Sequence, residues 1–171
     1  QVNQGTTFRV ELEGEIAPQE EAPAEEAQSR SPSSDRLFFG RRFLVAEDNA
    51  INAEILCELL QMYGAETVVK TDGTQAVREF QTAAPRNYDA ILMDIQMPQM
   101  NGYEATRIIR EMERPDAKDI PIVAMTANAF SEDVQASLAA GMTAHVAKPL
   151  DVDVLRDTLD KVLGRPNVQR G

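Results

Sequence analysis

The hydrophobic positions between residues 37 and 164 fall into short runs, separated by longer stretches of mixed polarity. The runs lack the polar alternation of a half-exposed strand, a pattern that is typical of strands covered on both faces in a parallel sheet. They predict strands at residues 43–46, 90–93, 122–125 and 145–147, with a weaker strand at 67–69.

In the stretches between these runs, apolar residues recur every three or four positions, which indicates amphipathic helices. The first helix is expected from Ile51 to Tyr63. The other four are expected to follow residues that can cap a helix: Asp72, Asn101, Ser131 and Asp151. Strand and helix thus alternate five times, which predicts a doubly wound α/β domain with a parallel sheet. We expect the charged faces of the helices to be solvated surface.

The residues before this domain have a different character. Phe8, Val10 and Leu12 alternate with polar or charged residues, which predicts a short strand. Residues 17–36 contain no large apolar side chain, so they cannot bury enough surface to offset the entropy of ordering. We therefore predict a flexible acidic linker over residues 15–37, a domain over residues 38–164 and a short tail over residues 165–171.

The composition excludes several classes of protein. The 171 residues include 28 acidic and 17 basic ones, giving a net charge of −11, and residues 1–36 contribute −5 through 8 acids and 3 bases. Such a chain is a poor general nucleic-acid binder, because phosphate contacts need clustered Lys and Arg. The single Cys excludes a disulfide framework or a thiolate zinc site, and the single His excludes chemistry that needs two imidazoles. No apolar run approaches the roughly 18–20 residues of a membrane span.

Residues with a carboxylate, hydroxyl or ammonium group follow the first, third, fourth and fifth predicted strands. They are Glu47 and Asp48 after the first strand, Asp94 after the third, Thr126 after the fourth and Lys148 after the fifth. Ligands of open α/β sheets bind at the carboxyl ends of the strands, so these side chains are expected to converge. Three carboxylates at one edge favour a cation, and oxygen ligands suit Mg²⁺. Together with an ammonium and a hydroxyl they fit phosphoryl transfer to a carboxylate, although any one of them could be ordinary surface charge.

These residues belong to motifs that resemble the response-regulator receiver domain. The resemblance covers residues 41–164 and rests on five motifs in order: Glu47-Asp48-Asn49, Met93-Asp94-Ile95-Gln96-Met97-Pro98, Asn101-Gly102-Tyr103-Glu104-Ala105, Met125-Thr126-Ala127-Asn128 and Ala147-Lys148-Pro149-Leu150. The residues of these motifs are similar to those of receivers in hybrid sensor histidine kinases. The resemblance implies a flavodoxin-like fold with five helices and strand order 2-1-3-4-5.

The resemblance implies a role for each residue in phosphoryl chemistry. Asp94 would accept the phosphoryl group of a phosphohistidine, Lys148 would pair with Asp94 and then with the phosphate, and Thr126 would be the switch hydroxyl. The Lys148–Pro149 bond is expected to be cis. Many receivers carry Tyr or Phe three residues before the Lys, where this chain has His145. This His is either a partly buried imidazole or a switch residue that also titrates near neutral pH.

The resemblance also implies a magnesium site and partners. Asp48, Asp94 and the backbone carbonyl of Gln96 would ligate Mg²⁺, with Glu47 nearby through water. The partners would be the dimerisation and phosphoacceptor domain of a histidine kinase and a histidine phosphotransfer protein, with no nucleic acid. We expect a monomer in the cytoplasm, from a parent kinase that could be anchored in the inner membrane.

The opening strand resembles the last strand of a histidine-kinase ATP-binding domain, so residues 1–14 are predicted to be its trailing strand. The nucleotide-binding boxes and the phosphoacceptor segment of a kinase are absent, so this chain is not expected to act as the kinase. Two other functions remain open. One is a receiver-fold interaction module that works without phosphorylation. The other is a haloacid-dehalogenase-like phosphatase, suggested by Thr71-Asp72-Gly73-Thr74, although that motif belongs after the first strand and needs an Asp where Lys70 stands.

Overall fold

The computed structural model describes residues 37–164 except residues 128–130, and for residues 131–133 it describes the backbone alone. The strand predicted within residues 1–14, the tail and all but the last residue of the acidic linker lie outside the described residues and stay predictions. No helix in the described part of the chain is long and apolar enough to cross a membrane.

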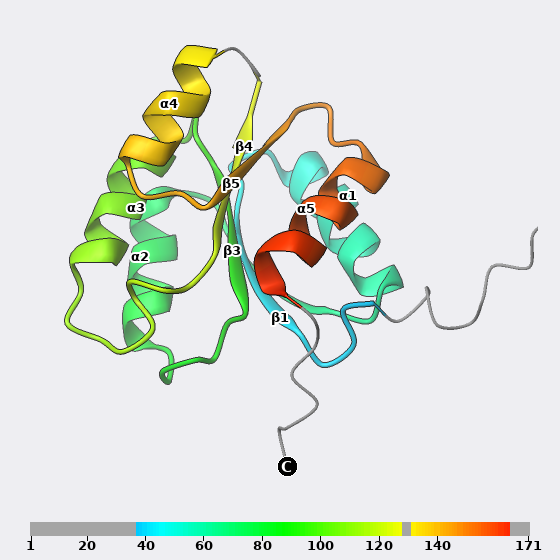
Figure 1. Ribbon diagram of the computed structural model, residues 1–171, viewed down its shortest axis with the longest axis horizontal. Coiled ribbons are helices and arrows are strands. Elements are labelled where there is room, and N and C mark those ends of the chain that lie inside the picture. The colour runs from blue at the N-terminus through cyan, green and yellow to red at the C-terminus, as the bar shows by residue number, and fades with distance from the viewer. Residues whose placement is uncertain (1–36, 128–130, 165–171) are drawn as a thin grey trace, which may run out of the picture. The chain divides into compact units, whose positions relative to one another are not determined.

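Across the described residues, five strands alternate with five helices (Figure 1). The strands are β1 (Arg42–Ala46), β2 (Glu66–Lys70), β3 (Ala90–Asp94), β4 (Ile122–Thr126) and β5 (Ala144–Ala147). The helices are α1 (Ala50–Met62), α2 (Gly73–Thr82), α3 (Gly102–Glu111), α4 (Ser131–Ala139) and α5 (Val152–Leu163). Neighbouring strands pair in parallel in the order β2-β1-β3-β4-β5. The predicted fold class and strand order are confirmed.

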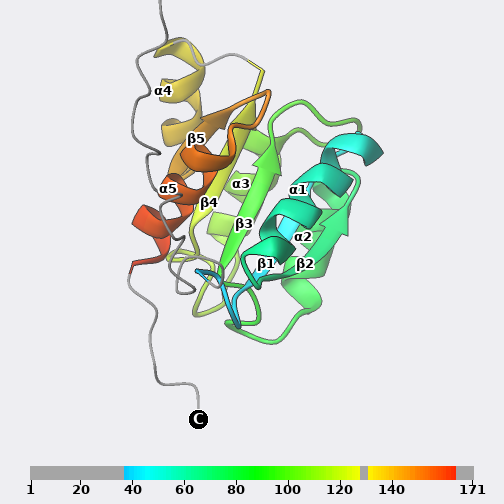
Figure 2. The ribbon, with the colours of Figure 1, turned by 90° about the vertical axis from the view of Figure 1, so that its right-hand side faces the viewer.

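The helices form two layers that cover both faces of the sheet (Figures 1 and 2). Helices α2, α3 and α4 lie on one face, and α1 and α5 lie on the other. Each face has its own apolar core, the first around Phe80, Ile91 and Ile109 and the second around Leu56 and Leu155. Every residue of β3 and β4 is buried, whereas β2 at the sheet edge is partly exposed. This exposure explains why the hydrophobic signal of β2 is weak.

Side-chain caps start four of the helices close to the ends of the preceding strands. They are Asn49 for α1, Asp72 for α2, Asn101 for α3 and Asp151 for α5. Each accepts hydrogen bonds from backbone N–H groups that have no partner within the helix. Three of these caps were predicted, and α4 begins at Ser131 itself. Because the helices start so soon, the loops at the carboxyl edge of the sheet are short.

Candidate functional site

The five residues expected from the sequence lie at the carboxyl edge of the sheet. β1 ends immediately before Glu47, and β5 ends immediately before Lys148. Asp94 and Thr126 are the last residues of β3 and β4. Because β1, β3, β4 and β5 are the four successive strands of a parallel sheet, their ends meet at one place.

The end of β2 stays outside this cluster. Lys70 pairs with Glu79 of α2, with 2.9 Å between the ammonium and carboxylate atoms. The Asp72 carboxylate caps α2 by accepting from the backbone N–H of Gln75 at 2.8 Å. The segment Thr71-Asp72-Gly73-Thr74, which superficially resembles a phosphatase loop, therefore contains the residue that caps α2.

Lys148 joins two buried carboxylates. Its Nζ donates to Oδ2 of Asp94 at 2.7 Å and to Oε2 of Glu47 at 2.6 Å. The Lys148 side chain is 20% exposed, whereas those of Glu47 and Asp94 are 2% and 7% exposed. The resemblance implied the pair with Asp94. The second pair, between groups 101 residues apart in the chain, was not predicted.

Glu47 is held on its other side by a residue of α1. The side-chain amide of Asn52 donates to Oε1 of Glu47 at 3.2 Å, so both oxygens of this carboxylate have partners. No role was predicted for Asn52 from the sequence. Its position in the first turn of α1, five residues after an acid at a strand end, is the signal that could have found it.

The three acids form a cluster with excess negative charge. Ligand oxygens of Glu47, Asp48 and Asp94 all lie within 4.8 Å of one another. Asp48 is exposed, while the other two are buried. Lys148 compensates only one of three negative charges. An all-oxygen set with this charge and an exposed side fits a hard divalent cation such as Mg²⁺, and it lacks the nitrogen and sulfur ligands typical of zinc.

The electrostatics of Asp94 and Lys148 follow from this crowding. Burial raises the pKa of the Asp94 carboxyl, and the bonds to Lys148 lower it by less, while the charge of Glu47 raises it further. For Lys148 burial lowers the pKa, but the bonds to Asp94 and Glu47 outweigh burial, so its pKa is raised. The ammonium therefore stays charged, and Asp94 is an acid whose negative charge is incompletely compensated.

The loop after Asp94 is folded tightly against the end of β3. The backbone N–H of Gln96 donates to Oδ1 of Asp94 at 3.1 Å, which places Gln96 beside the carboxylate. The N–H of Gly102, the first residue of α3, donates to the carbonyl of Ile95 at 3.0 Å. A Cβ atom at Gly102 would collide with the carbonyl oxygen of Asp94, so only glycine fits there. This explains the glycine in the Asn101-Gly102 motif.

The two proposed switch residues lie on neighbouring strands. Thr126 is 6% exposed, and its carbonyl accepts from the backbone N–H of Lys148 at 2.7 Å. His145 lies in β5, where it pairs in register with Ala124, and its side chain is half-buried. The Lys148–Pro149 bond is cis, as expected. The switch roles of Thr126 and His145 stay predictions.

The known proteins with similar sequences include histidine kinases. The chain is 38% identical over 122 residues to hybrid signal transduction histidine kinase I of Dictyostelium discoideum, covering 70% of this chain and 7% of that protein. It is 32% identical over 162 residues to probable histidine kinase 1 of rice, Oryza sativa subsp. indica, covering 78% of this chain and 16% of that protein. The chain thus matches a small part of these relatives.

Solved structures with the same fold are receiver domains. The receiver domain of sensor histidine kinase PA1611 from Pseudomonas aeruginosa, with a magnesium ion in its active-site cleft, matches with a TM-score of 0.66 and 38% identity over 73% of this chain and 98% of that one. The receiver domain of Saccharomyces cerevisiae Ssk1, in complex with the phosphotransfer protein Ypd1, matches with a TM-score of 0.64 and 26% identity over 72% of this chain and 89% of that one.

The match to a family of domains extends over most of the described residues. The family model of the response regulator receiver domain matches residues 43–160, which include every residue of the acidic cluster and Lys148. Family, fold and the arrangement of strand ends agree. The chain belongs to the response regulator receiver domain family and provides a receiver domain of the two-component phosphorelay type.

Proposed function

We propose that this receiver domain accepts a phosphoryl group on the Asp94 carboxylate from a phosphohistidine. The observation that supports the proposal is the position of Asp94: a buried carboxylate bonded to Lys148 at 2.7 Å, within a cluster of acids that fits a divalent cation. An oxygen of Asp94 attacks phosphorus, the P–N bond breaks, and the histidine keeps the electron pair and takes up a proton. The product is an acyl phosphate.

The residues around Asp94 have distinct tasks in this proposal. Lys148 holds an oxygen of the carboxylate before transfer and of the phosphoryl group afterwards, as its raised pKa keeps it cationic. The hydroxyl of Thr126 donates a hydrogen bond to another phosphoryl oxygen. Asp48, Asp94 and the Gln96 carbonyl are the proposed ligands of Mg²⁺, with Glu47 beside them. The ion would neutralise the negative charge that accumulates between phosphate and carboxylates.

The proposed donor surface lies beside the acidic cluster. Ile51 and Ile55 of α1 are 68% and 56% exposed, so two large apolar side chains of this helix are accessible to a partner. A pocket of about 180 Å³ connects this helix to the site, with these lining residues: Asn52, Ile55, Lys148, Pro149 and Leu150. We propose that the helical surface of a histidine phosphotransfer domain covers it, because a phosphohistidine must approach Asp94 closely. The complex of the Ssk1 receiver with Ypd1 supports such a partner.

The proposal extends to the protein from which this receiver comes. The curated relatives are histidine kinases, and the chain matches 7–16% of the length of the two described above. We propose that the parent protein is a hybrid histidine kinase and that this domain works in the cytoplasm, in relay with a kinase phosphoacceptor domain and a phosphotransfer protein. The kinase activity would reside in other segments.

A small acyl-phosphate donor tests the chemistry directly. Incubation of the protein with Mg²⁺ and acetyl phosphate is expected to add one phosphoryl group, detected by intact-protein mass spectrometry. Asp94→Asn should prevent the addition. Asp72→Asn is the matched control, because it removes a buried carboxylate at the same edge while Asn still caps α2. No addition to the wild type, or equal addition to Asp94→Asn, would contradict the proposal.

Beryllofluoride separates this proposal from a receiver that binds partners without phosphorylation. With Mg²⁺ it is expected to bind at Asp94 and to shift the NMR signals of Thr126 and Lys148. Unchanged signals at both residues, in a protein that still binds its partner, would favour the interaction module. Loss of the shifts in Asp94→Asn but not in Asp72→Asn would assign the ligand to the proposed site.

A further inference from the structure

The end of α4 is fastened at the edge of the sheet opposite the acidic cluster. Gly141, just beyond the helix, has φ +96°, a left-handed conformation that glycine adopts readily. Its N–H donates to the carbonyl of Leu138, and the N–H of Met142 donates to that of Ser137, both at 3.0 Å. This pair of bonds closes the helix in the Schellman arrangement, and buried Met142 anchors the turn in the core.

Arg110 of α3 reaches across to this turn. Its Nε donates to the carbonyl of Gly141 at 2.9 Å, and its Nη1 donates to the carbonyl of Ala117 at 2.8 Å. A Cβ atom at position 141 would lie 3.1 Å from Cγ of Arg110, so the arginine lies directly against the turn. The expectation that charged helix faces are solvated surface is wrong here, because Arg110 is half-buried and bridges two carbonyl groups.

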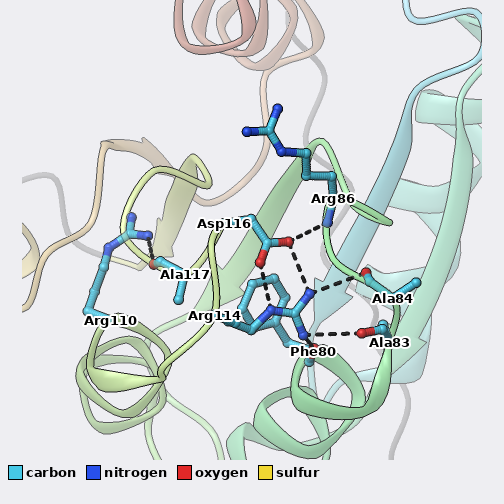
Figure 3. Close-up of polar contacts among 8 residues, drawn as sticks. All are labelled: Phe80, Ala83, Ala84, Arg86, Arg110, Arg114, Asp116 and Ala117. Carbon is cyan, nitrogen blue, oxygen red and sulfur yellow. Dashed lines mark hydrogen bonds and ion pairs between the residues drawn. The ribbon is translucent and has the colours of Figure 1, made fainter.

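The loop that receives the second bond of Arg110 is itself fixed. The Arg114 guanidinium lies over the ring of Phe80, 4.1 Å from its centre, and pairs with Asp116 at 2.6 Å (Figure 3). Arg114 also donates to three carbonyl groups at the end of α2: Phe80, Ala83 and Ala84. The α3–β4 loop is thereby joined to α2, and Arg110 joins the same loop to α4.

The two ends of α4 therefore stand in different surroundings. Its start follows β4, whose last residue Thr126 lies at the acidic cluster. Its end is held through Arg110 to a loop that Arg114 and Asp116 fix in place. The helix of nine residues spans about 14 Å at 1.5 Å per residue. A rearrangement that begins at Thr126 would act on one end of a rod whose other end is bonded.

We propose that Arg110 is a positioning residue that holds the end of α4, so that phosphorylation moves the start of the helix about this fixed end. The motion rests on the proposed function, but the hold does not. Arg110 touches no reacting atom, and its effect passes through the Gly141 carbonyl. A response to phosphorylation is therefore expected at the start of α4 and not at its end.

Amide hydrogen exchange without any phosphoryl donor tests the hold. Arg110→Met is expected to raise the exchange of residues 138–143 by about tenfold, the shift expected from losing hydrogen bonds to a charged donor. Arg107→Met is the matched control, since Arg107 is an exposed arginine of the same helix. Arg110→Lys, which keeps the charge and one donor group, should recover part of the protection. Equal exchange in Arg110→Met and Arg107→Met would overturn the hold.

The same measurement with Mg²⁺ and beryllofluoride tests the fixed end. In the wild type, exchange is expected to change at Thr126 and Val134–Ala136 but not at residues 138–143. In Arg110→Met the change should spread to residues 138–143, which a purely structural role would not produce. An equal response along all of α4 in the wild type would overturn the proposal. If no residue of the wild type responds, phosphorylation and motion both fail, while the donor-free measurement still decides whether Arg110 holds the turn.

Discussion

Two clusters of buried charge lie at opposite edges of the same sheet. At the carboxyl edge, Glu47 and Asp94 share the ammonium of Lys148, with exposed Asp48 adding a further negative charge. At the other edge, one arginine meets one acid: Arg114 pairs with Asp116 at 2.6 Å, and its remaining N–H groups reach backbone carbonyls. The first cluster has too much negative charge, and the second is balanced.

The two central acids show the difference in their pKa values. Burial raises the pKa of Asp94, and one shared ammonium does not reverse this shift. Burial also acts to raise the pKa of Asp116, but the bonds from Arg114 and from the Arg86 N–H outweigh it, so the pKa of Asp116 is lowered. A charge left incompletely compensated costs stability and favours binding of a cation. A compensated one holds loops together.

Removing the acid at the carboxyl edge should have the largest effect on function. Asp94→Asn is expected to abolish phosphoryl uptake and at the same time to raise the free energy of unfolding by roughly 1 kcal/mol, because it removes a charge whose burial outweighs its bonds to Lys148 and which Glu47 also repels. Urea denaturation at neutral pH, together with mass spectrometry, measures both quantities. Asp72→Asn serves as the comparison. If Asp94→Asn had a lower free energy of unfolding than the wild type, the acidic cluster would stabilise the fold, as the pair of Arg114 and Asp116 does.

The arginine at the opposite edge should show the reverse behaviour. Arg114→Met is expected to lower the free energy of unfolding by about 3 kcal/mol, since it leaves Asp116 buried without its partner. Phosphoryl uptake by the folded fraction should stay close to that of the wild type. Urea denaturation and the acetyl phosphate assay are the measurements, and Arg107→Met is the control. If Arg114→Met lost phosphoryl uptake but kept its free energy of unfolding, the two edges of the sheet would not have separate roles.

Acid titration should distinguish the clusters with a smaller effect. The folded pKa of Asp116 is lowered from 3.8, so its contribution to stability is present above 3.8 and is lost as the pH falls through the lowered value. The folded pKa of Asp94 is raised from 3.8, so its ionisation costs stability above the raised value, and acidification relieves this cost.

Urea denaturation from about pH 3 to pH 7 checks both signs. Relative to the wild type, Asp116→Asn should lose less stability on acidification, and Asp94→Asn should lose more. The same slope in all three proteins would show that neither acid has the shift described.

The smallest effect is expected at His145. His145→Tyr introduces the ring that many receivers carry, at a half-buried position, and should change the free energy of unfolding by no more than about 0.5 kcal/mol. Phosphoryl uptake should be unchanged. Any difference should appear in the beryllofluoride-dependent NMR shifts of Thr126 and in their pH dependence. Identical shifts in both proteins at every pH would show that His145 takes no part in the switch.

The sequence predicted the fold and the composition of the acidic cluster because both follow from local patterns. Apolar runs mark the strands, and parallel pairing brings Asp94 and Lys148 to one edge. The bond between Lys148 and Glu47 could not be predicted, because it depends on side-chain directions across strands far apart in the sequence. The bonds of Arg110 and Arg114 depend on how a loop packs on two helices, and nothing in the hydrophobic pattern marks an arginine that bridges carbonyl groups.

The reach of Lys148 to an acid 101 residues earlier also bears on the synthesis of the protein. A growing chain exposes Glu47 and Asp94 well before the ribosome releases β5, and until then the acids have no ammonium to join them. The complete cluster can form only when nearly the whole domain has emerged. A nascent receiver is therefore expected to be unable to accept a phosphoryl group. A truncated product that lacks β5 would then take no part in a phosphorelay.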